Sequence, residues 1–156
     1  MFGIIPEDRH LAGFTVRDLA DGLNGEIISG RTRLEDNIES FIIGALNPDH
    51  GSEYYARKSN KAVIVRSERA DMQLSALETP SKCLVLAGPK APVPVVLSRA
   101  ETRKVPVISV KQDVPEVLAR LEGIFRRTGF TQQKASRTIA VFNQYLDLDN
   151  LYQSLK

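Results

Sequence analysis

The segment Arg66-Ser67-Glu68-Arg69 carries three charges and a hydroxyl in four residues, directly after the apolar run AVIV at 62–65. Two guanidinium groups beside a hydroxyl could bind a phosphate or a carboxylate, because arginine donates paired hydrogen bonds to such oxygens. A charged turn is also typical of a solvated loop. Which interpretation holds depends on which other turns lie next to this segment in the folded chain.

Other turns that follow apolar runs also carry a cation or a hydrogen-bond donor. Their residues are Arg31, Arg33, Asn47, His50, Gly88, Lys90 and Lys111. Ligands of open α/β sheets bind outside the carboxyl ends of the strands, so parallel strands would bring these turns to one edge and form a phosphate or nucleotide site. An antiparallel first strand would remove Arg31 and Arg33 from that edge. The candidate ligand-binding residues are Arg66, Ser67, Glu68, Arg69, Gly88, Asn47, His50 and Lys111.

An alternation of short apolar strands with helices positions these turns. Strands are expected at 26–29, 40–46, 62–65, 83–88 and 105–110. Helices are expected from Thr15 to Gly22 or Gly25, after 47–50, and at 67–78, 93–104 and 113–127. Strands that are apolar at every position must be buried on both faces. The pattern therefore predicts an α/β three-layer sandwich, with a mostly parallel or mixed sheet of about five strands and helices on both faces.

The region after Gly129 has a different character. Thr131 opens a polar helix with one narrow apolar stripe, and a second stripe follows Asp147. This helical tail either packs on its own domain or serves as a connector or subunit contact. We expect a lead-in at 1–14, an α/β domain at 15–127 and the helical tail at 128–156.

The composition excludes several functional classes. A net charge of +2 gives no general attraction to nucleic acid or to anionic membranes. The apolar runs are far shorter than the ~20 residues that span a bilayer, and the N-terminus does not resemble a signal peptide. The single Cys83 is expected to be a buried reduced thiol, which favours the cytoplasm.

Catalytic motifs are missing from the chain. It has no phosphate-binding loop of the G-x-x-x-x-G-K-[ST] type, no G-x-S-x-G and no G-x-G-x-x-G. Only His10, His50 and Cys83 could serve a histidine-based triad or a zinc site. We therefore expect no catalysis by this chain alone, no cofactor and no metal.

Residues 15 to about 113 resemble a DRTGG domain, through TVRDLADGLNGEIISG, FIIGALNPDHG, AVIVRSERADMQLSALE and CLVLAGPKAPVPVV. The family signature joins an Asp-Arg pair after the third strand to a Thr-Gly-Gly turn after the fourth. Glu68 and Arg69 stand at the pair, and Ala87, Gly88 and Pro89 at the turn, so Arg69 and Gly88 match unchanged. GAL at 44–46 is similar to the family's Gly-Ala-Met turn.

The resemblance implies a fold similar to the N-terminal domain of HPr kinase. It also implies a place between a dethiobiotin-synthetase-like P-loop domain and the catalytic domain of long phosphate acetyltransferases, or beside CBS modules in regulated pyrophosphatases. FGIIPEDRHLAGFTV resembles the exit of such a P-loop domain, so the chain is expected to be a fragment of a larger protein or a relative that lost its neighbours.

The resulting expectation is a non-catalytic regulatory domain, homodimeric, that binds an adenine nucleotide or another phosphorylated metabolite at the carboxyl edge of its sheet. It would act on an enzyme of phosphate acetyltransferase-type metabolism. The alternatives are a structural homodimerisation module without a ligand, and a part of a phosphate acetyltransferase or a P-loop ligase.

Overall fold

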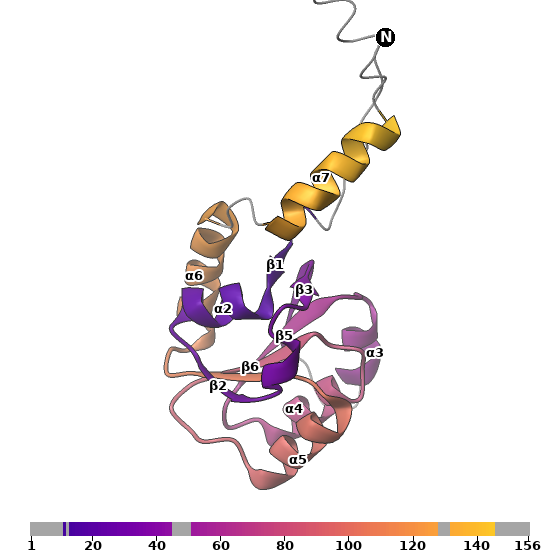
Figure 1. The fold of residues 1–156 in the computed structure, drawn as a ribbon. Helices are drawn as coiled ribbons and strands as arrows, with labels where there is room; N and C mark the ends of the chain where they lie inside the picture. The colour runs from indigo at the N-terminus through magenta and orange to yellow at the C-terminus, as the bar shows by residue number, and fades with distance from the viewer. Residues whose placement is uncertain (1–10, 12, 45–50, 128–131, 146–156) are drawn as a thin grey trace, which may run out of the picture. The chain divides into compact units, whose positions relative to one another are not determined.

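The computed structural model describes residues 11, 13–44, 51–127 and 132–145 (Figure 1). The chain divides into two units. One is Gly13–Thr128, and the other combines Met1–Ala12 with Gly129–Lys156. The second unit contains helix α7 (Gln132–Tyr145), on which three apolar side chains are exposed, Ile139, Phe142 and Tyr145. The tail helix is therefore confirmed, whereas Thr131 and the stripe after Asp147 lie outside the described residues.

The unit Gly13–Thr128 is built on a five-stranded sheet of order β2-β7-β6-β5-β4. The strands are β2 (Glu26–Ser29), β7 (Val107–Val110), β6 (Cys83–Ala87), β5 (Lys61–Arg66) and β4 (Ser40–Gly44). The last four are mutually parallel, and β2 pairs antiparallel with β7. The predicted mostly parallel or mixed sheet is confirmed. A two-residue pair, β1 (Phe14–Thr15) with β3 (Asn37–Ile38), was not predicted.

The central strands are buried on both faces, as their unbroken apolar sequences require. Every residue of β6 is buried, and so is every residue of β5 except Arg66. Cys83 is a free, fully buried thiol at the start of β6, and burial raises its pKa above the ordinary value. This position agrees with the predicted structural role of the cysteine.

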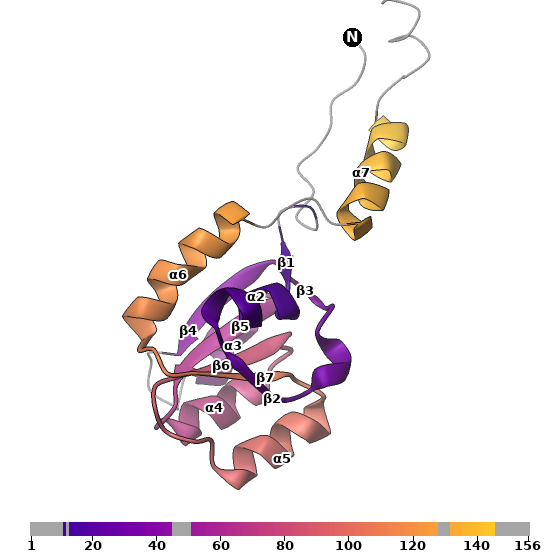
Figure 2. The same cartoon turned by 60° about the vertical axis from the view of Figure 1, so that its left-hand side comes forward.

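Helices cover both faces of the sheet, which confirms the three-layer sandwich (Figure 2). Helices α2 (Val16–Leu23) and α6 (Val114–Arg127) pack on one face around Leu19, Ile64 and Val85. Three helices, α3 (Gly51–Ala56), α4 (Ala70–Leu77) and α5 (Pro94–Arg103), pack on the other. Within the described residues, no helix has the length and apolar character needed to cross a bilayer.

The first predicted helix start is confirmed in detail. The Thr15 hydroxyl accepts a hydrogen bond from the Asp18 amide (3.1 Å), and the Asp18 carboxylate accepts one from the Thr15 amide (2.9 Å). This capping box satisfies two amides that the helix leaves unpaired. The helix ends at Leu23, because Asn24 adopts a left-handed conformation (φ 50°). The end lies between the two predicted glycines.

Lys61, the first residue of β5, is a fully buried lysine. Its ammonium donates a hydrogen bond to the carbonyl oxygen of Pro80 (2.5 Å), and burial lowers its pKa below the usual 10.5. No carboxylate of the described residues forms an ion pair with it. Burying the Lys61 ammonium removes its hydration, and its hydrogen bond to Pro80 fixes the loop that precedes β6.

Lys61→Met is expected to change how stability depends on pH. Between the lowered folded pKa and 10.5, the unfolded chain binds more protons than the folded one, so Lys61 makes the free energy of unfolding rise with pH. Urea unfolding from about pH 7 to about pH 10 should show wild type gaining stability relative to the variant. Equal pH slopes for the two proteins would contradict this account.

Candidate functional site

The loops after β5, β6 and β7 lie at one edge of the sheet. The parallel register aligns Arg66 with Ala87, and Ala87 with Val110, at the carboxyl ends of the three strands. Two bonds continue this register beyond the strands, from the Ser67 amide to the Ala87 carbonyl (2.8 Å) and from the Gly88 amide to the Val110 carbonyl (3.0 Å). Residues 67, 88 and 111 therefore begin three adjacent loops.

Ser67 joins two of these loops. Its hydroxyl oxygen accepts a hydrogen bond from the Lys90 amide (3.2 Å), and the residue is 5% exposed. It therefore supports the turn that carries Lys90.

Gly88 allows these loops to approach each other. It adopts a positive φ of 123°, and a Cβ atom there would lie 2.7 Å from the Ser67 hydroxyl oxygen and 3.7 Å from a carboxylate oxygen of Glu68. Such a backbone conformation is accessible to glycine and strained for other residues. The glycine is therefore required by the packing of the Ser67 loop, whatever binds there.

Arg69 is held by a carboxylate of its own helix start. Its guanidinium donates to Asp71 in a two-point arrangement, with Nε to Oδ1 at 3.0 Å and a terminal nitrogen to Oδ2 at 2.9 Å. This bond raises the pKa of Arg69 and lowers that of Asp71. Both side chains are substantially exposed, so the pair contributes little to stability. An anion at this edge would share Arg69 with Asp71.

Three other cations of this edge are exposed and form no ion pair with any carboxylate in the described part of the chain. They are Arg66 after β5, Lys90 after β6 and Lys111 after β7. Glu68, also exposed, opposes part of their charge. Because neighbouring strands lie about 4.8 Å apart, the outer two loops are separated by roughly 10 Å at the sheet, which is a span suited to a phosphorylated ligand.

Two buried polar groups lie near the carboxyl ends of β4 and β5. The Gln73 amide nitrogen donates to the carbonyls of Arg66 (2.8 Å) and Ser67 (3.1 Å), while its side-chain oxygen has no partner among the described residues. The hydroxyl of Tyr55, on α3, likewise has no partner within the part of the chain that the structure describes, and burial raises its pKa to about 12. Neither residue was predicted from the sequence to belong to a site. The signal for Gln73 was a glutamine on the apolar stripe that contains Leu77.

The other predicted site residues are placed elsewhere or lie outside the description. Asn47 and His50 fall in the segment 45–50, which is not among the described residues. Arg31 and Arg33 follow β2, and because β2 is antiparallel they lie at the opposite edge of the sheet. Within the described residues, no group of three or more histidine, cysteine, aspartate and glutamate side chains could hold a metal ion.

Comparison with known proteins places this geometry in a family context. The family described as the DRTGG domain matches residues 18–124. A phosphate acetyltransferase of Synechocystis sp. is 25% identical over 166 residues, covering 100% of this chain and 24% of the relative. A phosphate acetyltransferase of Nitratidesulfovibrio vulgaris is 23% identical over 159 residues, covering 95% of this chain and 22% of the relative. The chain thus spans about a quarter of the length of these two enzymes.

A solved structure supports the fold independently. It contains the CBS and DRTGG domains of the regulatory region of Clostridium perfringens pyrophosphatase, complexed with the activator diadenosine tetraphosphate. The TM-score is 0.60 and the identity 17%, over 73% of this chain and 50% of that one. At this identity the similarity shows a common fold.

Proposed function

Because the chain belongs to the DRTGG domain family, we propose that it is a regulatory domain that binds an adenine nucleotide or another phosphorylated metabolite at the carboxyl edge of its sheet. It acts on an attached or associated phosphate acetyltransferase. The names of the two relatives support the link to that enzyme, and the activator in the pyrophosphatase structure supports a nucleotide as the ligand.

The observation that carries this proposal is a set of three cations on adjacent loops, Arg66, Lys90 and Lys111, that form no ion pair with the carboxylates of the described residues. A phosphate group would gain charge-assisted hydrogen bonds from such side chains without first displacing a carboxylate. Arg69 contributes less, because Asp71 already occupies two of its three donor nitrogens. The proposed function includes a homodimer, which light scattering at micromolar protein concentration checks.

Titration calorimetry with AMP, ATP and diadenosine tetraphosphate tests the proposed ligand. We expect saturable binding, and a Kd about tenfold or more weaker in Arg66→Gln and in Lys111→Gln, because each loses a charge-assisted contact. Lys58→Gln is the matched control, since Lys58 is an exposed lysine located before β5, at the other edge.

Thermal unfolding in the same buffers gives a second readout, since a ligand at a hundred times its Kd adds about 2.7 kcal/mol of stability. The proposal fails if neither the three nucleotides nor a panel of other phosphorylated metabolites binds at millimolar concentration to the folded chain. It also fails if the double variant Arg66→Gln/Lys111→Gln binds as tightly as wild type.

A further inference from the structure

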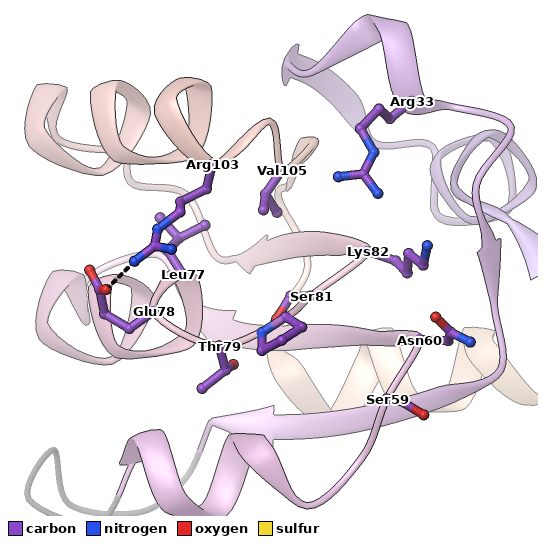
Figure 3. A pocket seen from close by; sticks show the side chains of 11 residues that line it. Arg33, Ser59, Asn60, Leu77, Glu78, Thr79, Ser81, Lys82, Arg103 and Val105 are labelled. Carbon is purple, nitrogen blue, oxygen red and sulfur yellow. Dashed lines mark hydrogen bonds and ion pairs between the residues drawn. The ribbon is translucent and has the colours of Figure 1, made fainter.

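A cavity of about 350 Å³ lies at the opposite edge of the sheet, where the parallel strands begin (Figure 3). Its lining comes from the segments that precede β5, β6 and β7, together with Arg33 from the turn after the antiparallel strand β2. The volume is within the range of small-molecule sites. This edge is separate from the loops that carry Arg66 and Lys111.

The lining of this amino-edge pocket is cationic. Three of its side chains are basic, Arg33, Lys82 and Arg103, and one is acidic, Glu78. Figure 3 shows Arg33 and Lys82 on one side of the pocket and the Arg103–Glu78 pair on the other. Cations that face each other across a small cavity favour a ligand with negative charge on more than one oxygen.

Two carboxylates at the pocket, Asp36 and Glu78, are each shared by two cations. Asp36 accepts from two nitrogens of Arg33, Nε (2.9 Å) and one terminal nitrogen (2.5 Å), and lies 3.5 Å from the Lys82 ammonium. Glu78 pairs with Arg103 (2.6 Å) and with Arg99 (3.2 Å). A shared carboxylate leaves each cation with donors that it does not occupy.

One further carboxylate lies close by. Glu39 accepts a hydrogen bond from the Asn60 amide nitrogen (3.1 Å), and Asn60 lines the pocket. Glu39 therefore occupies a donor of Asn60.

The floor of the pocket is fixed before any ligand arrives. Thr79 and Ser81 both donate their hydroxyl groups to the Ala76 carbonyl (2.9 and 3.3 Å), and the buried ammonium of Lys61 holds the Pro80 carbonyl. Arg33 is anchored as well, since it donates to the Lys104 carbonyl (3.1 Å). A preformed site loses less conformational entropy when it binds a ligand.

We propose that the amino-edge pocket binds a small dianion, either a phosphate monoester or a dicarboxylate, between Arg103 on one side and Arg33 with Lys82 on the other. The ligand oxygens take hydrogen bonds from the donors that Asp36 and Glu78 leave unused. The domain then carries two anion sites, one at each edge of the sheet, and the second could bind a metabolite different from the nucleotide.

Nuclear magnetic resonance titration of the ¹⁵N-labelled chain tests this second site, with inorganic phosphate, glycerol 3-phosphate and succinate as probes at low ionic strength. We expect saturable shifts of the Ser81 and Lys82 amides with at least one probe, and a Kd about tenfold or more weaker in Arg103→Gln and in Lys82→Gln. Binding of succinate alone identifies a dicarboxylate site, and binding of the two phosphates alone identifies a phosphate site.

Arg120→Gln is the matched control, because Arg120 is also a helical arginine in an exposed ion pair, with Glu116 (3.1 Å), and lies outside the pocket. It should bind each probe as wild type does. The inference is overturned if no probe shifts the Ser81 and Lys82 amides at about 10 mM, a concentration that detects millimolar Kd values. Equal affinity of wild type, Arg103→Gln and Lys82→Gln overturns it too.

The titration can overturn the proposal for one site without overturning the proposal for the other. Shifts confined to the Ser67 and Gly88 amides, and weakened by Lys111→Gln, would support the carboxyl-edge site and overturn the amino-edge one. Shifts confined to the Ser81 and Lys82 amides would support anion binding in the amino-edge pocket. The proposed function would then be tested by the calorimetric titration with nucleotides.

Discussion

Gly30→Ala is expected to lower the free energy of unfolding by about 3 kcal/mol, which combines the strain of a left-handed backbone with an overpacked contact. Gly30 follows β2 with φ at 74°, and a Cβ atom there would lie 2.4 Å from the Cα atom and 2.6 Å from the backbone nitrogen of Pro106. Backbone atoms cannot rotate away as a flexible side chain can. The turn after β2 and the start of β7 would have to separate.

The matched control is Gly123→Ala in α6, where an added Cβ atom meets nothing within 4 Å. Removing a glycine from a helix interior should raise the free energy of unfolding by about 0.5–1 kcal/mol. Urea unfolding of both variants and wild type measures the two effects. A Gly30→Ala protein as stable as wild type would show that the approach to Pro106 does not constrain the fold.

Gly30→Ala should also change the geometry of the amino-edge pocket. The turn that begins at Gly30 leads directly into Arg31–Arg33, and the Arg33 guanidinium bonds the Lys104 carbonyl two residues before Pro106. A displaced turn moves Arg33 away from Lys82 and Arg103. Gly30→Ala should therefore also weaken the binding of the anionic probe that wild type binds there.

The sequence predicted the layers of the fold because strand burial leaves a local pattern. The apolar runs in β5 and β6 and the stripe through Val117 and Leu121 in α6 are each visible within one segment. The direction of β2 is not, because EIIS has the same composition whether it pairs parallel or antiparallel. The β1–β3 pair was missed since two residues are too short for any periodicity.

Prediction of the candidate sites from the sequence meets the same limit. The loops after β5, β6 and β7 could be grouped from the sequence, because parallel strands place them together by rule. The bond from Arg69 to Asp71 could not be foreseen, since a separation of two residues is compatible with many side-chain directions. The pocket brings Arg33, Lys82 and Arg103 together from distant positions, and only the sheet order reveals that.

Gly44→Ala is expected to lower the free energy of unfolding by about 2 kcal/mol through overpacking. Gly44 is the last residue of β4, and a Cβ atom there would lie 2.4 Å from the Tyr55 hydroxyl oxygen and 2.8 Å from a methyl carbon of Val65. Tyr55 is fully buried, so its ring has little room to withdraw. The glycine at the end of β4 is thus explained by the tyrosine that packs over it.

Tyr55→Phe should rescue much of this loss. The single substitution removes a buried hydroxyl without a partner in the described residues, so it should leave stability unchanged or raise it slightly. In the double variant the 2.4 Å contact disappears while the Val65 contact remains, so we expect a coupling energy of about 1 kcal/mol in a double-mutant cycle. Tyr54→Phe, which removes the neighbouring hydroxyl, should give no rescue. If the effects of Gly44→Ala and Tyr55→Phe on stability are simply additive, the tyrosine does not determine the glycine, and the close approach of β4 to α3 has another cause.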